Sequence, residues 1–212
     1  QPDLGTSLAI VTIVFLMLFM SGAKIKHIMV VILAALPLLY LGIFKIPYRK
    51  NRMLAFLHPW KDPRGTGFQI IQSFLALGLG GVLGTGLGQS TQKLFYLPEA
   101  HTDFIFSIIG EEIGFLGLAA IIFLYVVLIW QGMRIVAKAE DSFGSLVSLG
   151  IISMIALEAC VHIAVTTGSL PTKGLPLPFI SYGGTSLVMH MAGIGLLLNI
   201  AKISDTERTV NV

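Results

Sequence analysis

The chain has 212 residues, of which 55% are hydrophobic and only 12% are charged, and its mean hydropathy is +0.86. Soluble domains carry roughly 25% charged residues, so this composition excludes a soluble globular enzyme and a disordered tail. The single Cys160 excludes an intrachain disulfide, and a net charge of +3 is too small to indicate a nucleic-acid partner. We therefore expect an all-α, polytopic integral membrane helical bundle. Gln1 at the first position predicts a fragment.

Four uncharged stretches, and one that is interrupted by Glu158 and His162, are long enough to cross the hydrocarbon core, which needs about 20 apolar residues. They cover residues 4–23, 27–44, 113–133, 142–167 and 182–201. Residues 67–88 are also uncharged, but glycine disfavours a long helix. This last stretch predicts a short helix and a glycine-rich turn in or at the membrane, with a full crossing as the alternative.

Five spans divide the loops between two faces. Residues 24–26, 134–141 and 202–212 share one face, which their Lys and Arg residues predict to be cytoplasmic. The segment 45–112 and the loop 169–181 are then extracytoplasmic. The long segment is also basic, either because the charge rule weakens for long loops or because its cations serve an anionic ligand.

The extracytoplasmic segment is rich in apolar and aromatic residues. These predict packing on the membrane surface, with Trp60 and Tyr96 as interfacial residues. The glycine cluster at residues 78–88 does not match a dinucleotide-binding motif. It predicts either a backbone nest for a pyrophosphate or close packing through small residues.

Asp103 directly precedes a helical pattern at residues 104–114. It is either the N-cap of that helix or a carboxylate in an extracytoplasmic cleft that accepts a proton. Helical spacing places Ser107 and Glu111 on its face, whereas Glu112 points the opposite way.

An acid inside a membrane span is a functional candidate by default. Glu158 lies in the fourth stretch, and His162 follows four residues later on the same face. We predict a structural pair between Glu158 and either His162 or a neighbouring helix, rather than a transport site. His190 is predicted to be a buried, hydrogen-bonded helix contact.

The segment 170–186 contains three prolines, which favour extended backbone, and two glycines, which permit close approach. These residues are Pro171, Pro176, Pro178, Gly183 and Gly184. Its single cation is Lys173. The segment either lines a pocket for an anionic head group or is a stiff connector.

Four long motifs carry a family resemblance. They are QPDLGTS at residues 1–7, DPRGTGFQIIQS at 62–73, GLGQSTQKLFYLPEAHTDFIFSIIGEEIGFLG at 86–117 and LPTKGLPLPFISYGGTSL at 170–187. In this order they closely resemble the SEDS family (shape, elongation, division and sporulation), which includes FtsW, RodA and SpoVE. The amino-acid sequences of the motifs QKLFYLPEAHTDF and PTKGLPLPF are more similar to the division and sporulation branch than to the elongation branch.

This resemblance implies a ten-span protein of the bacterial plasma membrane with both termini in the cytoplasm, of which this chain corresponds to the last five spans. It also implies a peptidoglycan glycosyltransferase that polymerises lipid II during cell division or sporulation. The implied partners are a class B penicillin-binding protein and other divisome proteins. The family's essential acid matches Asp103, and the chain alone is expected to be inactive.

The expected substrate-binding residues surround that acid in two segments. They are Glu99, His101, Thr102, Lys173, Ser181, Tyr182, Gly183 and Gly184. Asp103 would deprotonate the acceptor's 4-hydroxyl as general base. The leaving undecaprenyl pyrophosphate needs positive charge, for which the candidates are Arg49, Lys50, Arg52 and Lys173, or a divalent cation.

Two competing functions remain. A lipid II flippase would use Glu158 and His162 and would not polymerise its cargo. A non-catalytic scaffold for the penicillin-binding protein would tolerate every polar substitution. No residue set of the sequence predicts a protein metal site.

Overall fold

The computed structural model describes residues 4–45, 47–92 and 101–210. Within them the elements are α1 (Leu4–Met20), α2 (Ile25–Phe44), α3 (Pro47–Leu57), a 3-10 turn (Pro59–Lys61), α4 (Phe68–Gly80), α6 (Ile105–Lys138), α7 (Ser142–Thr166) and α8 (Gly184–Val210). These described ranges contain no strand, so the prediction of an all-α fold is confirmed.

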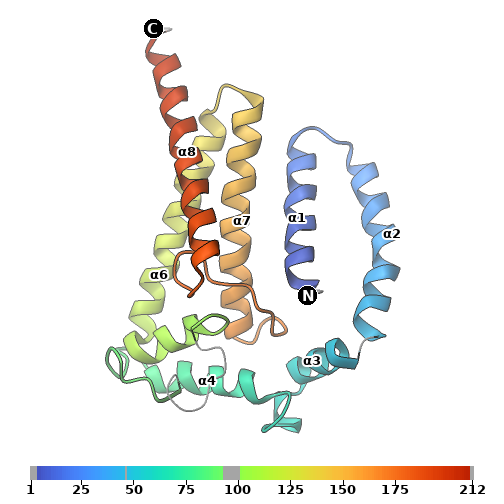
Figure 1. The fold of residues 1–212 in the computed structure, drawn as a ribbon, viewed down its shortest axis with the longest axis vertical. Helices are drawn as coiled ribbons and strands as arrows, with labels where there is room; N and C mark the ends of the chain where they lie inside the picture. Colours follow the sequence, from blue (N-terminus) through green and yellow to red (C-terminus); the bar gives the residue numbers. More distant parts are fainter. Residues whose placement is uncertain (1–3, 46, 93–100, 211–212) are drawn as a thin grey trace.

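The long helices α6, α7 and α8 run side by side, and α1 packs on α7 with α2 outside it (Figure 1). The short helices α3 and α4 lie across one end of this bundle. We call that end, with residues 47–92, 101–104 and 170–183, the loop-rich end. The opposite end, with residues 21–24, 139–141 and the end of α8, is called the short-turn end. The turns that the sequence assigns to one face thus lie together.

Within the part of the chain that the structure describes, three helices are long and apolar enough to cross a membrane, namely α6, α7 and the Gly184–Ser204 part of α8. The helices α1 and α2 contain shorter apolar stretches, Gly5–Met20 and Ile25–Pro37. Large apolar side chains cover the outside of the bundle, as at Phe123 and Val188, each 65% exposed. Such a surface is suited to lipid, and the protein is an integral membrane protein.

The observed helix boundaries differ most from the predicted spans at two places. The third span was predicted to begin at residue 113, but α6 begins at Ile105 and includes all but the first residue of the predicted pattern at 104–114. The last helix continues to Val210 instead of ending at 201. An apolar run in the sequence marks only the lipid-facing part of a helix, whereas the helix itself continues as long as its backbone hydrogen bonds are satisfied.

The core lies mainly between α6 and α7. At its centre Phe106 and Tyr125 of α6 pack against Ile155 and Ala159 of α7. Leu177, which comes from the loop-rich end, belongs to the same cluster and is only 1% exposed. The segment 170–183 is therefore anchored in the core instead of lying loosely over it.

A break interrupts α6 at Gly114, whose backbone is non-helical with φ 74° and ψ −170°. A break frees backbone groups that must find other partners. The glycine cluster provides them through four hydrogen bonds: Thr85 N to Glu111 O (2.9 Å), Gly86 N to Glu112 O (3.0 Å), Phe115 N to Gly81 O (2.9 Å) and Leu116 N to Val82 O (3.2 Å).

The two backbones approach so closely that a Cβ atom on Gly84 would lie 2.2 Å from the carbonyl oxygen of Glu112. The cluster therefore serves close packing through small residues, which was one of its two predicted roles. Its amides at Thr85 and Gly86 already donate to α6. The pyrophosphate nest finds no support here.

Candidate active site

Asp103 lies in a turn at residues 101–104, directly before α6. The N-cap of α6 is Phe104, whose side chain cannot cap, so the prediction of Asp103 as N-cap is wrong by one residue. Phe104 is 2% exposed and packs against Ile108 and Val165. This anchor fixes the turn on the bundle while Asp103 stays partly exposed.

Two segments 79 residues apart interlock around this turn. The amide of Tyr182 donates to the carbonyl oxygen of His101 at 3.0 Å, and the hydroxyl of Ser181 donates to that of Thr102 at 2.8 Å. The same hydroxyl accepts from the amide of Leu177 at 2.8 Å. These bonds bring together four of the predicted substrate-binding residues: His101, Thr102, Ser181 and Tyr182.

Gly174 lies directly against the Asp103 carboxylate. A Cβ atom at Gly174 would lie 3.1 Å from one carboxylate oxygen and 3.4 Å from the other. Because glycine has no side chain, the Asp103 carboxylate fits at this position without a steric clash. Sequence reasoning did not single out Gly174, and the PTKGLPLPF motif around it is the signal that pointed to this segment.

The structure describes the side chains of two of the four candidate cations, Arg52 and Lys173. Arg52 of α3 donates from Nη1 to the carbonyl oxygen of Thr172 at 3.3 Å, so it reaches the segment that faces Asp103. Lys173 follows Thr172 and is partly exposed. The side chains of Arg49 and Lys50 lie outside the described part of the chain, as does all of Glu99.

Side chains of two helices, α6 and α7, donate hydrogen bonds to the backbone of the segment 172–180. His162 of α7 is 1% exposed and donates from Nδ1 to the carbonyl oxygen of Leu175 at 2.8 Å. The hydroxyl of Tyr125 of α6 donates to the carbonyl oxygen of Pro178. Phe179 has a positive φ of 66°, a conformation that costs a bulky residue about 1–3 kcal/mol. These contacts attach the segment to α6 and α7 at two points.

The acid inside the bundle pairs with a neighbouring helix. Glu158 accepts a hydrogen bond from Nε2 of His190 at 2.8 Å, and Ser186 contacts Nδ1 of the same ring at 3.2 Å. Of the two predicted partners of Glu158, the neighbouring helix is the observed one, and His162 faces Leu175 instead. The prediction of His190 as a buried helix contact is confirmed, since it is 3% exposed.

The two residues expected on the face of Asp103 anchor neighbouring elements. Ser107 contacts the hydroxyl of Ser73 at 2.6 Å, which docks α4 on α6. Glu111 is 1% exposed and accepts from the hydroxyl of Ser90 at 2.5 Å, and from the amide and hydroxyl of Thr91 at 3.1 and 3.0 Å. This buried carboxylate is thus fully hydrogen-bonded.

A profile of the cell cycle protein family FtsW/RodA/SpoVE matches residues 1–206. The chain is 47% identical over 201 residues to the probable peptidoglycan glycosyltransferase FtsW of Geobacter metallireducens, covering 95% of this chain and 54% of that protein. It is 49% identical over 204 residues to stage V sporulation protein E of Bacillus subtilis, covering 96% and 56%. The chain thus spans about half the length of these relatives.

Solved structures show the same fold. One of them was described under the heading "Structural coordination of polymerization and crosslinking by a peptidoglycan synthase complex". It matches with a TM-score of 0.75 and 32% sequence identity, and the match covers 96% of this chain and 57% of that one. The rod shape determining protein RodA of Thermus thermophilus matches with a TM-score of 0.60 and 27% identity, over 95% and 50%.

Proposed function

Because the chain belongs to the FtsW/RodA/SpoVE family of cell cycle proteins, we propose that it acts in a bacterial peptidoglycan glycosyltransferase that polymerises lipid II into glycan strands. The observation that carries this proposal is the position of Asp103. Its turn is tied to the segment 172–182, and Gly174 lies against its carboxylate. A preorganised carboxylate at the end of a lipid-embedded bundle suits a substrate whose tail lies in the membrane and whose sugars lie outside it.

In the proposed reaction Asp103 is the general base. It takes the proton of the acceptor's 4-hydroxyl as that oxygen attacks the anomeric carbon of the donor. The new bond joins this carbon to the acceptor oxygen, with inversion. The bond from the same carbon to the pyrophosphate oxygen breaks, and undecaprenyl pyrophosphate leaves with the electron pair.

The leaving group gathers negative charge, which nearby cations stabilise. Arg52 and Lys173 are the cations that the described structure brings to the segment facing Asp103. A divalent cation is the alternative. Among the described residues, no group of three His, Cys, Asp or Glu side chains could hold one, so a metal would need the substrate or other residues as ligands.

The proposed orientation places the loop-rich end outside the cell and the short-turn end in the cytoplasm, as the Lys and Arg residues of the short turns indicate. The proposed partner is a class B penicillin-binding protein, which would crosslink the new strands. The structural relative from a complex that coordinates polymerization and crosslinking supports this partner. The names of the curated relatives support a role in division or sporulation.

The test is D103N in the native full-length protein, assayed for glycan strands from purified lipid II with its partner. Loss of a general base should slow polymerisation by about 100-fold or more. The matched control is D62N, which removes another exposed carboxylate from the loop-rich end, and whose side chain still accepts from the amide of Thr66. Near-native synthesis by folded D103N protein would refute the assignment.

The flippase and scaffold hypotheses give different results in the same preparation. A flippase would move lipid II across vesicle membranes without forming strands, and it would depend on Glu158 more than on Asp103. A scaffold would bind its penicillin-binding partner but form no polymer with any variant. The hydrogen bond between Glu158 and His190 joins α7 to α8 and favours a structural role for that acid.

A further inference from the structure

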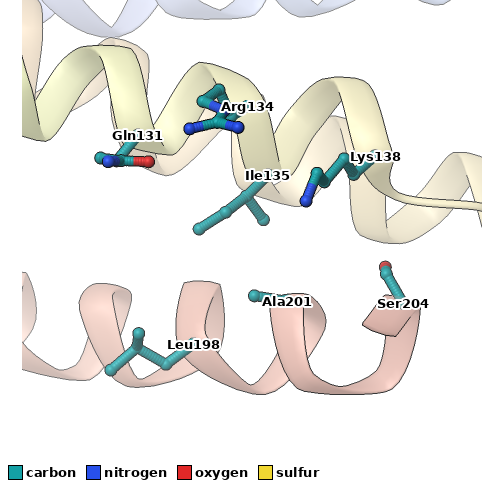
Figure 2. A pocket seen from close by; sticks show the side chains of 7 residues that line it. All are labelled: Gln131, Arg134, Ile135, Lys138, Leu198, Ala201 and Ser204. Atoms are coloured by element: carbon teal, nitrogen blue, oxygen red, sulfur yellow. The ribbon is translucent and has the colours of Figure 1, made fainter. Parts of the chain in front are cut away.

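A second polar feature lies at the short-turn end, far along the bundle from Asp103. There a cleft of about 330 Å³ separates the last turns of α6 from α8 (Figure 2). Its lining residues are Gln131, Arg134, Ile135, Lys138, Leu198, Ala201 and Ser204. The cleft thus combines an apolar wall with two cations and two uncharged polar groups.

The two cations are placed to act together. Arg134 and Lys138 are four residues apart on α6 and therefore lie on one face of it. Both are exposed, and among the side chains that the structure describes no carboxylate pairs with either one. In Figure 2 Lys138 extends from α6 toward α8, and Ser204 extends from α8 toward α6.

The cleft also lies at the depth of a membrane–water boundary. The guanidinium of Arg134 is 5.5 Å from the ring centre of Trp130, which is 59% exposed. Tryptophan concentrates at the interface of a membrane. Arginine and lysine near helix ends extend their charges to the same level. An anion that meets these cations is therefore at the height of lipid head groups.

We propose that this cleft binds the phosphate head group of an anionic phospholipid in the leaflet at the short-turn end. Arginine presents paired donors to a phosphate, and Lys138 adds a second charge. Gln131 and Ser204 face the polar remainder of the head group, while Leu198 contacts the acyl chain. Basic pockets between membrane helices bind such head groups, and the volume lies within the range of ligand sites, ~300–1,000 Å³.

The experiment is native mass spectrometry of the full-length protein, purified from mixed phosphatidylglycerol and phosphatidylcholine. The native protein should retain phosphatidylglycerol in preference. Loss of one charge-assisted contact to the bound phosphate should weaken retention about fivefold, so K138Q should weaken it about fivefold and R134Q/K138Q about 25-fold. The matched control is K24Q/K26Q, which removes two exposed lysines from the same end and should retain the lipid normally.

Three outcomes overturn the proposal. Equal retention by R134Q/K138Q would exclude the site, and equal loss in K24Q/K26Q would mean a diffuse surface attraction. Inorganic phosphate that binds the lipid-free protein as tightly would mean a site for a free anion. R134K/K138R keeps both charges and should retain the lipid. If R134Q/K138Q does not fold, the single exposed substitution K138Q decides the question.

Discussion

The two ends of the bundle are built differently. At the loop-rich end, segments far apart in the chain bind one another, as Thr85 binds Glu111 and Ser181 binds Thr102. At the short-turn end the turns close locally. The amide of Ala139 donates to the carbonyl oxygen of Ile135 at 3.0 Å, and Asp141 caps α7 by accepting from Gly144 at 3.1 Å.

This difference bears on what each end can do. Within lipid, polar chemistry is confined to helix ends and protein-lined sites. Interlocked segments hold a carboxylate and its surroundings in one arrangement before substrate binds, and such preorganisation is the main source of electrostatic catalysis. Local turns leave long cationic side chains free to meet a small anion. The loop-rich end therefore suits chemistry and the short-turn end suits head-group binding.

The largest predicted effect is on the break in α6. G84A adds a Cβ atom 2.2 Å from the Glu112 carbonyl oxygen at a φ of +80°. Strain and overpacking should destabilise the protein by about 3 kcal/mol or more, measured by thermal unfolding in detergent. The matched control is G78A in α4, where a Cβ atom meets nothing within 4 Å. It should be neutral or stabilising by about 0.5–1 kcal/mol. A stable G84A protein would contradict the close packing of the loop-rich end.

The second prediction separates the middle of the bundle from its ends. E158Q weakens a charge-assisted bond to the buried His190 and should destabilise the protein by about 2 kcal/mol. The folded fraction should still polymerise lipid II, because Asp103 is untouched. E140Q, an exposed acid at the short-turn end, should change stability by less than about 0.5 kcal/mol. Loss of polymerisation in stable E158Q protein would contradict a purely structural role for Glu158.

The sequence predicts the helices well because their signal is local. Apolar runs mark the membrane helices. The predicted helical pattern at 104–114 ends, and the predicted third span at 113–133 begins, where α6 breaks at Gly114. The pattern could not show that these two pieces form one element. The bonds that bridge the break come from residues 81–86, about 30 positions upstream.

Tertiary contacts were beyond local patterns for the same reason. Helical spacing correctly places Glu158 and His162 on one face, but the choice of partner depends on which neighbouring element offers a matching group. His190 lies 32 residues after Glu158, and Arg52 lies 120 residues before Thr172. The proximity of Gly174 to Asp103 arises only when both segments lie on the bundle.

The third prediction tests the fit around the carboxylate. G174A places a methyl group 3.1 Å from an oxygen of Asp103, so the carboxylate must shift by a few tenths of an ångström. Misplacement of a catalytic group by about 1 Å can slow a reaction 100-fold, so this smaller shift should lower kcat about tenfold with little change in stability. G195A, where nothing lies within 4 Å, should be neutral. Unchanged kcat in G174A would contradict the prediction that the space at Gly174 fixes the position of the Asp103 carboxylate.

The smallest predicted effect concerns the support of the segment that faces Asp103. Y125F removes the hydroxyl that donates to the Pro178 carbonyl oxygen, a loss of about 1 kcal/mol in stability. Since Phe179 keeps its positive φ only while its surroundings hold it, relaxation of this turn should also lower polymerisation about two- to threefold. Enzyme kinetics and thermal unfolding on one preparation measure both. A fall in stability with fully native kinetics would mean that the interlock at residues 101–103 and 181–182 positions Asp103 without help from α6.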